Sequence, residues 1–139
     1  MKGLDSLIRL NEWKLDEKRR KVAELERFAQ RLHGQLISLD KEVKSEQKVT
    51  AADPAVGGSY ANYAHEAIRR REKILKSLAG VEVEMSRAFD EVAAAFREFK
   101  KFDTIRVRNE ERAQLLEKRA QQAELDEAGL GVFRRQNPR

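Results

Sequence analysis

Two histidines and many carboxylates are the side chains of this sequence that could take part in acid–base or metal chemistry. The histidines are His33 and His65. If the helices predicted below fold back on each other, the two histidines lie roughly 16 Å apart along the axis, too far to share a metal ion. Most carboxylates have a Lys or Arg one helical turn away, as in Glu24 with Arg27, which is typical of solvated helix pairs. We therefore expect no enzyme, catalytic residue, metal site or cofactor.

The pair Gly57–Gly58 could in principle cradle a phosphate group. A phosphate loop would also need a glycine-rich fingerprint, a following Lys-Ser and a preceding strand, and the sequence has none of these. Pro54 disfavours helix at the residue before it, and the glycines permit positive φ. Residues 50–59 are therefore predicted to form a turn.

The longest regular stretch runs from residue 60 to residue 127 and contains no proline. Its apolar residues recur alternately four and three positions apart, the pattern of a helix that packs lengthwise on another helix. A helix of this length is about 100 Å long, so we predict an extended coiled coil. We call these positions the seam of the second helix: Tyr60, Ala64, Ala67, Arg71, Ile74, Leu78, Val81, Met85, Ala88, Val92, Ala95, Phe99, Phe102, Arg106, Asn109, Ala113, Leu116, Ala120 and Ala123.

Residues 4–49 carry a second seam with the same alternation: Leu4, Ile8, Asn11, Leu15, Lys18, Val22, Leu25, Ala29, Leu32, Leu36, Leu39 and Val43. The turn lets the two helices run antiparallel as an αα-hairpin. The predicted fold is thus all-α, an antiparallel two-helix coiled-coil hairpin in one domain. Its parts are a helix at 4–49, a turn at 50–59, a helix at 60–127 that ends before Gly129, and a basic tail at 128–139.

The polar residues Asn11 and Lys18 interrupt the first seam. Polar seam residues commonly set the register of a coiled coil at some cost in stability. Alternatively, they mark an end of the hairpin that meets a partner.

The register of the hairpin follows from the turn. If residue 49 faces residue 60, the numbers of facing residues sum to about 109. This register places Trp13 near Phe96 and predicts one aromatic cluster that also includes Phe99 and Phe102. Trp13 lies outside the seam, so it either packs on the flank of the hairpin or contacts a partner.

The second helix outruns the first by roughly 20 residues, from Arg106 to Glu127. Its seam residues there are small or polar, and nothing in the chain remains to pair with them. A helix of that length is marginal in water by itself, although continuing a longer helix removes the nucleation cost. The overhang is a frayed end, a surface for self-dimerisation, or a segment that enters another protein.

Charge and composition exclude several other classes of protein. The net charge is +5, but the basic excess is spread along the chain, whereas nucleic-acid binders gather it into a patch. The sequence has no cysteine, no apolar run long enough for direct membrane insertion and no visible signal peptide. We expect a cytoplasmic protein that binds no nucleic acid.

Several blocks of sequence, in this order, resemble the FliJ family, the small coiled-coil component of the bacterial flagellar type III export apparatus, in the form typical of alphaproteobacteria. The resemblance covers essentially the whole chain. The blocks are Ser6-Leu7-Ile8-Arg9, Tyr60-Ala61-Asn62-Tyr63, Ala88-Phe89-Asp90-Glu91, Phe99-Lys100-Lys101-Phe102 and Leu125-Asp126-Glu127-Ala128-Gly129-Leu130.

The resemblance implies a stalk-like coiled coil that sits peripherally at the inner-membrane export apparatus. It implies three partners: the hexameric flagellar export ATPase, whose assembly it promotes, the cytoplasmic domain of the export-gate membrane protein, and export chaperones. The implied ATPase contacts are Ile8, Asn11, Trp13, Lys18, Arg106, Arg108, Arg112 and Leu116. The implied gate contacts are Val43, Tyr60, Tyr63 and Ile74.

Two other functions compete with this expectation. A generic coiled-coil scaffold would share the seams, and its mass in solution would reveal a parallel dimer. A helical chaperone with tentacles would need a β platform, for which the sequence has no strand pattern.

Overall fold

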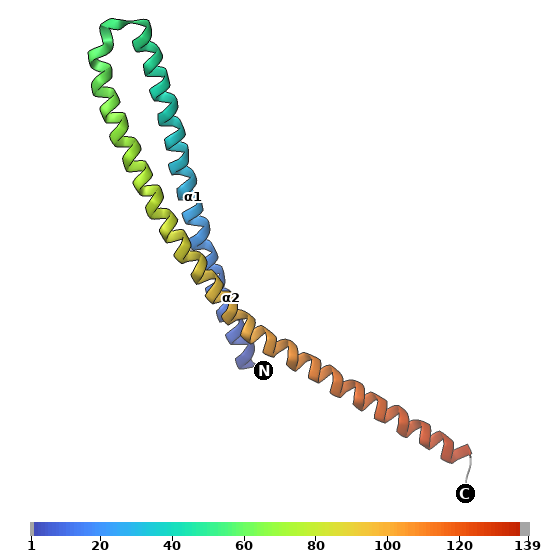
Figure 1. Cartoon of the computed structure of the whole chain (residues 1–139). Coiled ribbons are helices and arrows are strands. Elements are labelled where there is room, and N and C mark those ends of the chain that lie inside the picture. Colours follow the sequence, from blue (N-terminus) through green and yellow to red (C-terminus); the bar gives the residue numbers. More distant parts are fainter. Residues whose placement is uncertain (1, 137–139) are drawn as a thin grey trace. The chain divides into compact units, whose positions relative to one another are not determined.

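The computed structural model describes residues 2–136, apart from the side chain of Val56. Helix α1 spans Lys2–Ala52, a short 3-10 helix η1 spans Pro54–Val56, and helix α2 spans Gly57–Gln136 (Figure 1). No strand occurs among the described residues, and the two long helices pack against each other. The predicted all-α hairpin is therefore confirmed.

Contacts group the chain into two units. Unit 1 comprises Met1–Glu12 and Arg97–Arg139, and unit 2 comprises Trp13–Phe96. We describe each unit separately, and the expectation of a single domain stays a prediction.

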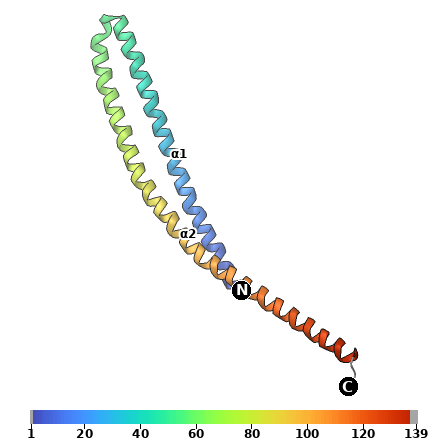
Figure 2. The same ribbon diagram turned by 45° about the vertical axis from the view of Figure 1, so that its right-hand side comes forward.

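Unit 2 is an antiparallel hairpin in which α1 and α2 lie side by side on either side of the turn (Figures 1 and 2). A cluster of buried residues, Leu32, Leu78 and Val81, forms the centre of its core. Lys18 pairs with Glu91, and their residue numbers sum to 109. Nearer the turn, Arg70 pairs with Glu42 and Arg71 with Asp40, sums of 112 and 111, so the pairing there is shifted by two or three residues from the predicted sum of about 109. The buried apolar residues of unit 2 all lie at predicted seam positions: Leu15, Val22, Leu32, Leu39, Ala67, Leu78, Val81 and Ala88.

The turn is shorter than the ten residues predicted. Asp53 is extended, with φ −135° and ψ 98°, and its Oδ1 accepts a hydrogen bond from the backbone N–H of Ala55 at 3.1 Å. Pro54 follows as the first residue of η1, where its fixed φ suits a helix start. The glycines do not use the positive φ that they permit, and Gly57 is helical, with φ −58° and ψ −36°.

Unit 1 contains the first residues of α1 beside the middle of α2. Ile8 and Asn11 are buried, whereas Phe102 and Arg106 of α2 are half-buried. Every residue from 107 to 130 is exposed, so α2 has no partner there among the described residues. The predicted overhang of the second helix is thus confirmed.

Helix α2 continues past the point where its end was predicted. Gly129 and Gly131 lie inside the helix, which reaches Gln136, so 128–136 is not a separate tail. Each glycine costs about 1 kcal/mol relative to alanine, but extending an existing helix carries no nucleation cost. The last three residues of the predicted tail, 137–139, lie outside the described residues.

Candidate functional site

Two of the predicted ATPase contacts, Ile8 and Asn11, are buried within unit 1. Their exposed fractions are 7% and 6%. The Asn11 side-chain amide donates a hydrogen bond to the Leu7 carbonyl oxygen at 2.8 Å, which satisfies one polar group of a seam residue. Burial favours a packing role for both residues, and their contact with a partner stays a prediction.

Arg106 is the last half-buried seam residue of α2 in unit 1. Its guanidinium group forms ion pairs with carboxylates of its own helix. One guanidinium nitrogen lies 2.6 Å from Asp103 Oδ1 and the other lies 3.5 Å from Glu110 Oε1. The hydrogen bond with Asp103 is the main reason that the pKa of Arg106 is raised, so the charge is permanent. Arg106 therefore offers little unpaired charge to a partner.

The stretch of α2 beyond Arg106 is different, because its side chains point into solvent. Residues 107–136 contain six Lys or Arg and six Asp or Glu, so this stretch has no net charge. Arg108 and Arg112 are exposed, and Leu116 is 64% exposed. Other apolar side chains in the stretch are similarly open: Leu115, Leu125, Leu130, Val132 and Phe133. Exposed apolar side chains along a helix without a partner are typical of an interaction surface.

Lys18 and Trp13, also predicted ATPase contacts, belong to unit 2. Lys18 Nζ lies 3.2 Å from Glu91 Oε2, and Lys21 Nζ lies 3.8 Å from the same oxygen. The hydrogen bond from Lys18, followed by the charges of both lysines, lowers the pKa of Glu91. Trp13 is 59% exposed, so it is not a core residue. Its membership of one aromatic cluster with Phe96, Phe99 and Phe102 stays a prediction.

Replacing Glu91 by Gln is expected to lower the melting temperature of the chain by about 1–3 °C at pH 7 in low salt. The folded state lowers the Glu91 pKa, so the ion pair stabilises the fold above the carboxylate's unfolded-state pKa. That stabilisation is lost as the pH falls through the folded-state pKa. Thermal melts followed by circular dichroism at neutral and acid pH measure the effect. Glu84→Gln is the control, and a difference between wild type and Glu91→Gln that persists in acid would contradict the prediction.

The four predicted gate contacts, Val43, Tyr60, Tyr63 and Ile74, all lie in unit 2, in the part of the hairpin nearest the turn. All four are half-buried. Val43 and Tyr60 line a groove of about 300 Å³ between the helices. Tyr60 and Tyr63 are neighbours, with ring centroids 6.3 Å apart, and they line a smaller groove of about 260 Å³ beside the turn. The structure thus brings three of the four together.

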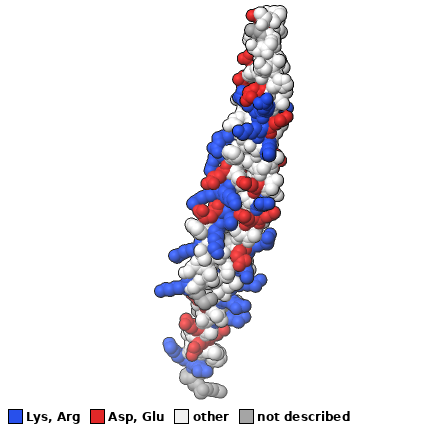
Figure 3. All heavy atoms as spheres, turned by 90° about the vertical axis from the view of Figure 1, so that its left-hand side faces the viewer, with Lys and Arg blue, Asp and Glu red and all other residues white. Residues whose placement is uncertain are grey.

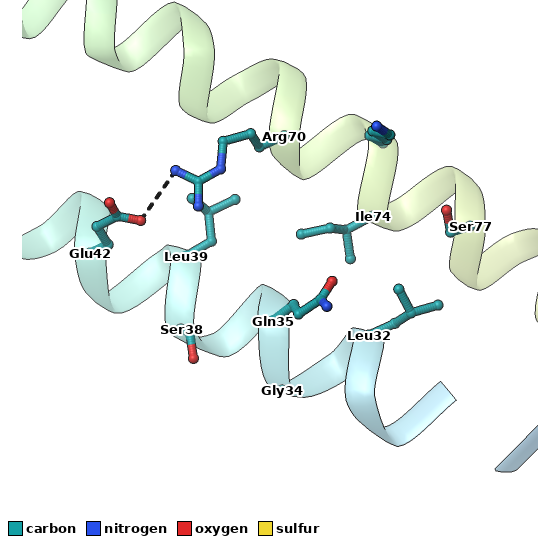
Figure 4. Close-up of a pocket in the computed structure, with 10 residues that line it drawn as sticks. Leu32, Gly34, Gln35, Ser38, Leu39, Glu42, Arg70, Ile74 and Ser77 are labelled. Atoms are coloured by element: carbon teal, nitrogen blue, oxygen red, sulfur yellow. Dashed lines mark hydrogen bonds and ion pairs between the residues drawn. The ribbon is translucent and has the colours of Figure 1, made fainter. Parts of the chain in front are cut away.

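Ile74 lies in a separate groove of about 660 Å³. Figure 4 shows Leu39 and Ile74 pointing between the helices, with the ion pair of Arg70 and Glu42 at one end of the groove. The nitrogen and oxygen of that pair are 3.4 Å apart. Gly34 also lines this groove.

The Tyr63 hydroxyl is shielded from solvent and has no hydrogen-bond partner among the described residues. Loss of solvation, and then the negative charge of Glu42, raises the pKa of Tyr63. The hydroxyl therefore stays protonated at neutral pH, beside the carboxylate of Glu42.

The face of the molecule shown in Figure 3 carries interspersed charges rather than a patch of one sign. In Figure 3, Lys and Arg alternate with Asp and Glu along most of the visible face, and the end with the turn is largely uncharged. Within residues 2–136, no group of three His, Asp or Glu side chains could hold a metal ion. In the same range, no helix combines the length and apolar character that crossing a membrane requires.

Comparisons with known proteins point to one family. Residues 1–138 match the family model described as flagellar FliJ protein. Flagellar FliJ proteins of two Caulobacter vibrioides strains are 26% identical to the chain over 100 residues, which is 72% of this chain and 72% of each relative. No solved structure matches. Because the family model covers nearly every residue, the chain belongs to the flagellar FliJ family.

Proposed function

We propose that this component of the flagellar export apparatus binds the export ATPase through the exposed part of α2 and contacts the export gate near the turn. The observation that carries the proposal is the unpartnered stretch of α2, in which every residue from 107 to 130 is exposed. Without a partner, the apolar side chains of this stretch are in contact with water. A bound partner would cover them.

The chemistry of this stretch suits a reversible complex. Leu116 and Leu125 are 64% and 67% exposed and supply apolar contacts. Arg108 and Arg112 supply charges whose attraction to a partner weakens as salt rises. Several weak contacts along one helix give an interface that binds its partner and still lets it dissociate.

The region near the turn suits a second partner. It has apolar grooves between the helices, lined in part by Val43, Tyr60 and Ile74. Tyr63 adds an aromatic ring next to Tyr60 and a buried hydroxyl beside Glu42. We assign these residues to the cytoplasmic domain of the export gate. We also propose contact with export chaperones. This part of the proposal rests on membership of the family and is assigned to no particular residue.

Reversing two charges of the exposed stretch, with Arg108→Glu and Arg112→Glu together, is expected to weaken ATPase binding by about three- to tenfold in low salt. The loss should shrink as salt rises, because exposed charges are screened. Co-sedimentation with the purified ATPase, titrated against salt, measures this.

The matched control changes the same amount of charge elsewhere, with Arg69→Glu and Lys76→Glu together. Both control residues are exposed and lie on α2 in unit 2. Equal weakening by the two double variants would show a general charge effect and would count against a specific ATPase surface on α2.

A further inference from the structure

Helix α2 carries a second row of residues beside its seam, shifted by one position. The shift turns the row by about 100° around the helix, so it faces a different direction from the seam. We call this row the outer stripe. Its members again alternate four and three apart: Ile68, Glu72, Leu75, Ala79, Glu82, Ser86, Phe89, Ala93 and Phe96.

The outer stripe is exposed, although it contains large apolar side chains at intervals of seven residues. The exposed fractions are 55% for Ile68, 43% for Leu75, 50% for Phe89 and 41% for Phe96. Residues seven apart lie on nearly the same face of a helix. All members belong to unit 2, where α1 covers the seam. Every member of the outer stripe is exposed, and only Ile68, at one end, also lines the groove between the helices that Val43 and Tyr60 line.

Such a regular row differs from scattered surface hydrophobics. A helix can pack lengthwise against two other helices, one on each face, when the apolar residues of both faces recur alternately four and three positions apart. The inner face already packs against α1. The outer stripe therefore has the form of a surface for one further helix, about 42 Å long if all of the stripe is used.

The charges of the outer stripe indicate the chemistry of that helix. Its two ionised members, Glu72 and Glu82, are both acidic and exposed. Neither takes part in an ion pair in the part of the chain that the structure describes. A partner with Lys or Arg at the facing positions would neutralise both carboxylates and bury the apolar residues between them.

A second copy of this chain does not fit as well. Glu82 is the midpoint of the outer stripe, which runs from Ile68 to Phe96. Two copies packed through the full stripe, parallel or antiparallel, would place the two Glu82 carboxylates opposite each other. Like charges in that position disfavour self-association.

We propose that the outer stripe binds an amphipathic helix of another protein, packed lengthwise on α2, with basic residues facing Glu72 and Glu82. This surface shares no residue with the proposed ATPase surface, and only Ile68 also lines the groove of the gate residues Val43 and Tyr60. The residues substituted in the test below, Glu72, Leu75, Glu82 and Phe89, lie outside that groove. The test is therefore independent of the proposed function.

The experiment uses the full chain and two synthetic helical peptides as probes. Both peptides carry leucines alternately four and three apart, and they differ only in having Lys or Glu at the two positions that would face Glu72 and Glu82. Fluorescence anisotropy is expected to show the Lys peptide binding at least about tenfold more tightly than the Glu peptide. The double variant Glu72→Lys with Glu82→Lys should reverse this preference.

Variants locate the binding site of the Lys peptide. Leu75→Glu with Phe89→Glu should weaken binding at least about tenfold, because both side chains lie at the centre of the stripe. Val83→Glu is the matched control, since Val83 is 56% exposed but lies off the stripe, and it should change the affinity by less than about twofold. Circular dichroism checks that each variant keeps its helix content.

Three results would overturn the proposal. Equal affinity for the two peptides would remove the charge argument, and wild-type affinity in the Leu75→Glu, Phe89→Glu variant would place the peptide elsewhere. Concentration-dependent self-association in sedimentation experiments, lost in that same variant, would show that a second copy covers the stripe instead.

Discussion

Removal of residues 107–139 is expected to abolish co-sedimentation with the export ATPase while leaving the helical hairpin folded. The exposed stretch of α2 makes no tertiary contact that buries its residues from 107 to 130, so its loss should hardly change the melting temperature. The same loss removes the apolar and charged side chains proposed to form the ATPase surface. Co-sedimentation and thermal melts on the same preparation measure the two effects separately.

A substituted full-length chain distinguishes loss of the surface from loss of length. Replacing Leu116, Leu125 and Phe133 by Gln keeps the helix but removes side chains that are 64%, 67% and 60% exposed. We expect intermediate binding from this chain, because its charged residues remain. A truncated protein that still sediments with the ATPase would move the contact to another part of the chain.

Leu78→Ala is expected to destabilise unit 2 by about 2–3 kcal/mol. Leu78 is 6% exposed and packs in the central cluster with Leu32 and Val81. The substitution removes buried methyl groups and leaves a cavity between two helices that cannot close freely. Urea denaturation followed by circular dichroism gives the change in the free energy of unfolding.

Leu75→Ala is the matched control, three residues earlier on the same helix. Leu75 is 43% exposed, so its truncation should cost less than about 1 kcal/mol. Equal losses for the two variants would mean that the seam does not dominate the stability of the hairpin. The comparison also tests the division of α2 into a packed seam and an open outer stripe.

The seam could be predicted from the sequence because it is a local pattern. Alternating intervals of four and three keep residues on one face of a helix, whatever the rest of the chain does. Leu15, Val22, Leu78 and Ala88 are accordingly buried where the pattern places them. The pairing of Lys18 with Glu91 followed from the position of the turn.

The ends of the helices were less predictable, because local signals compete there. The Gly129 and Gly131 positions lower helix propensity, but an existing helix extends through them to Gln136. Near the turn, the carboxylate of Asp53 caps η1 and the fixed φ of Pro54 suits its first residue. Helical structure therefore resumes within residues 50–59, which were predicted to form the turn.

The candidate site was predictable only in part. Arg108, Arg112 and Leu116 lie on the exposed stretch, as the unequal helix lengths predicted. Ile8 and Asn11 were named as ATPase contacts by resemblance alone, whereas their seam positions agree with the burial that the structure shows.

The sequence by itself determined two helices of unequal length, because their periodicity is a local pattern. The position of the turn between them then determined their antiparallel pairing and the exposed end of the longer helix. Only the tertiary structure decided how closely the predicted seam of α2 approaches α1 and how exposed the adjacent row remains. Small residues at Ala67 and Ala88 let the backbones approach along the seam, and both are buried there. The outer stripe has Ile68 and Phe89 at the corresponding levels, and bulky side chains hold a neighbouring backbone farther away.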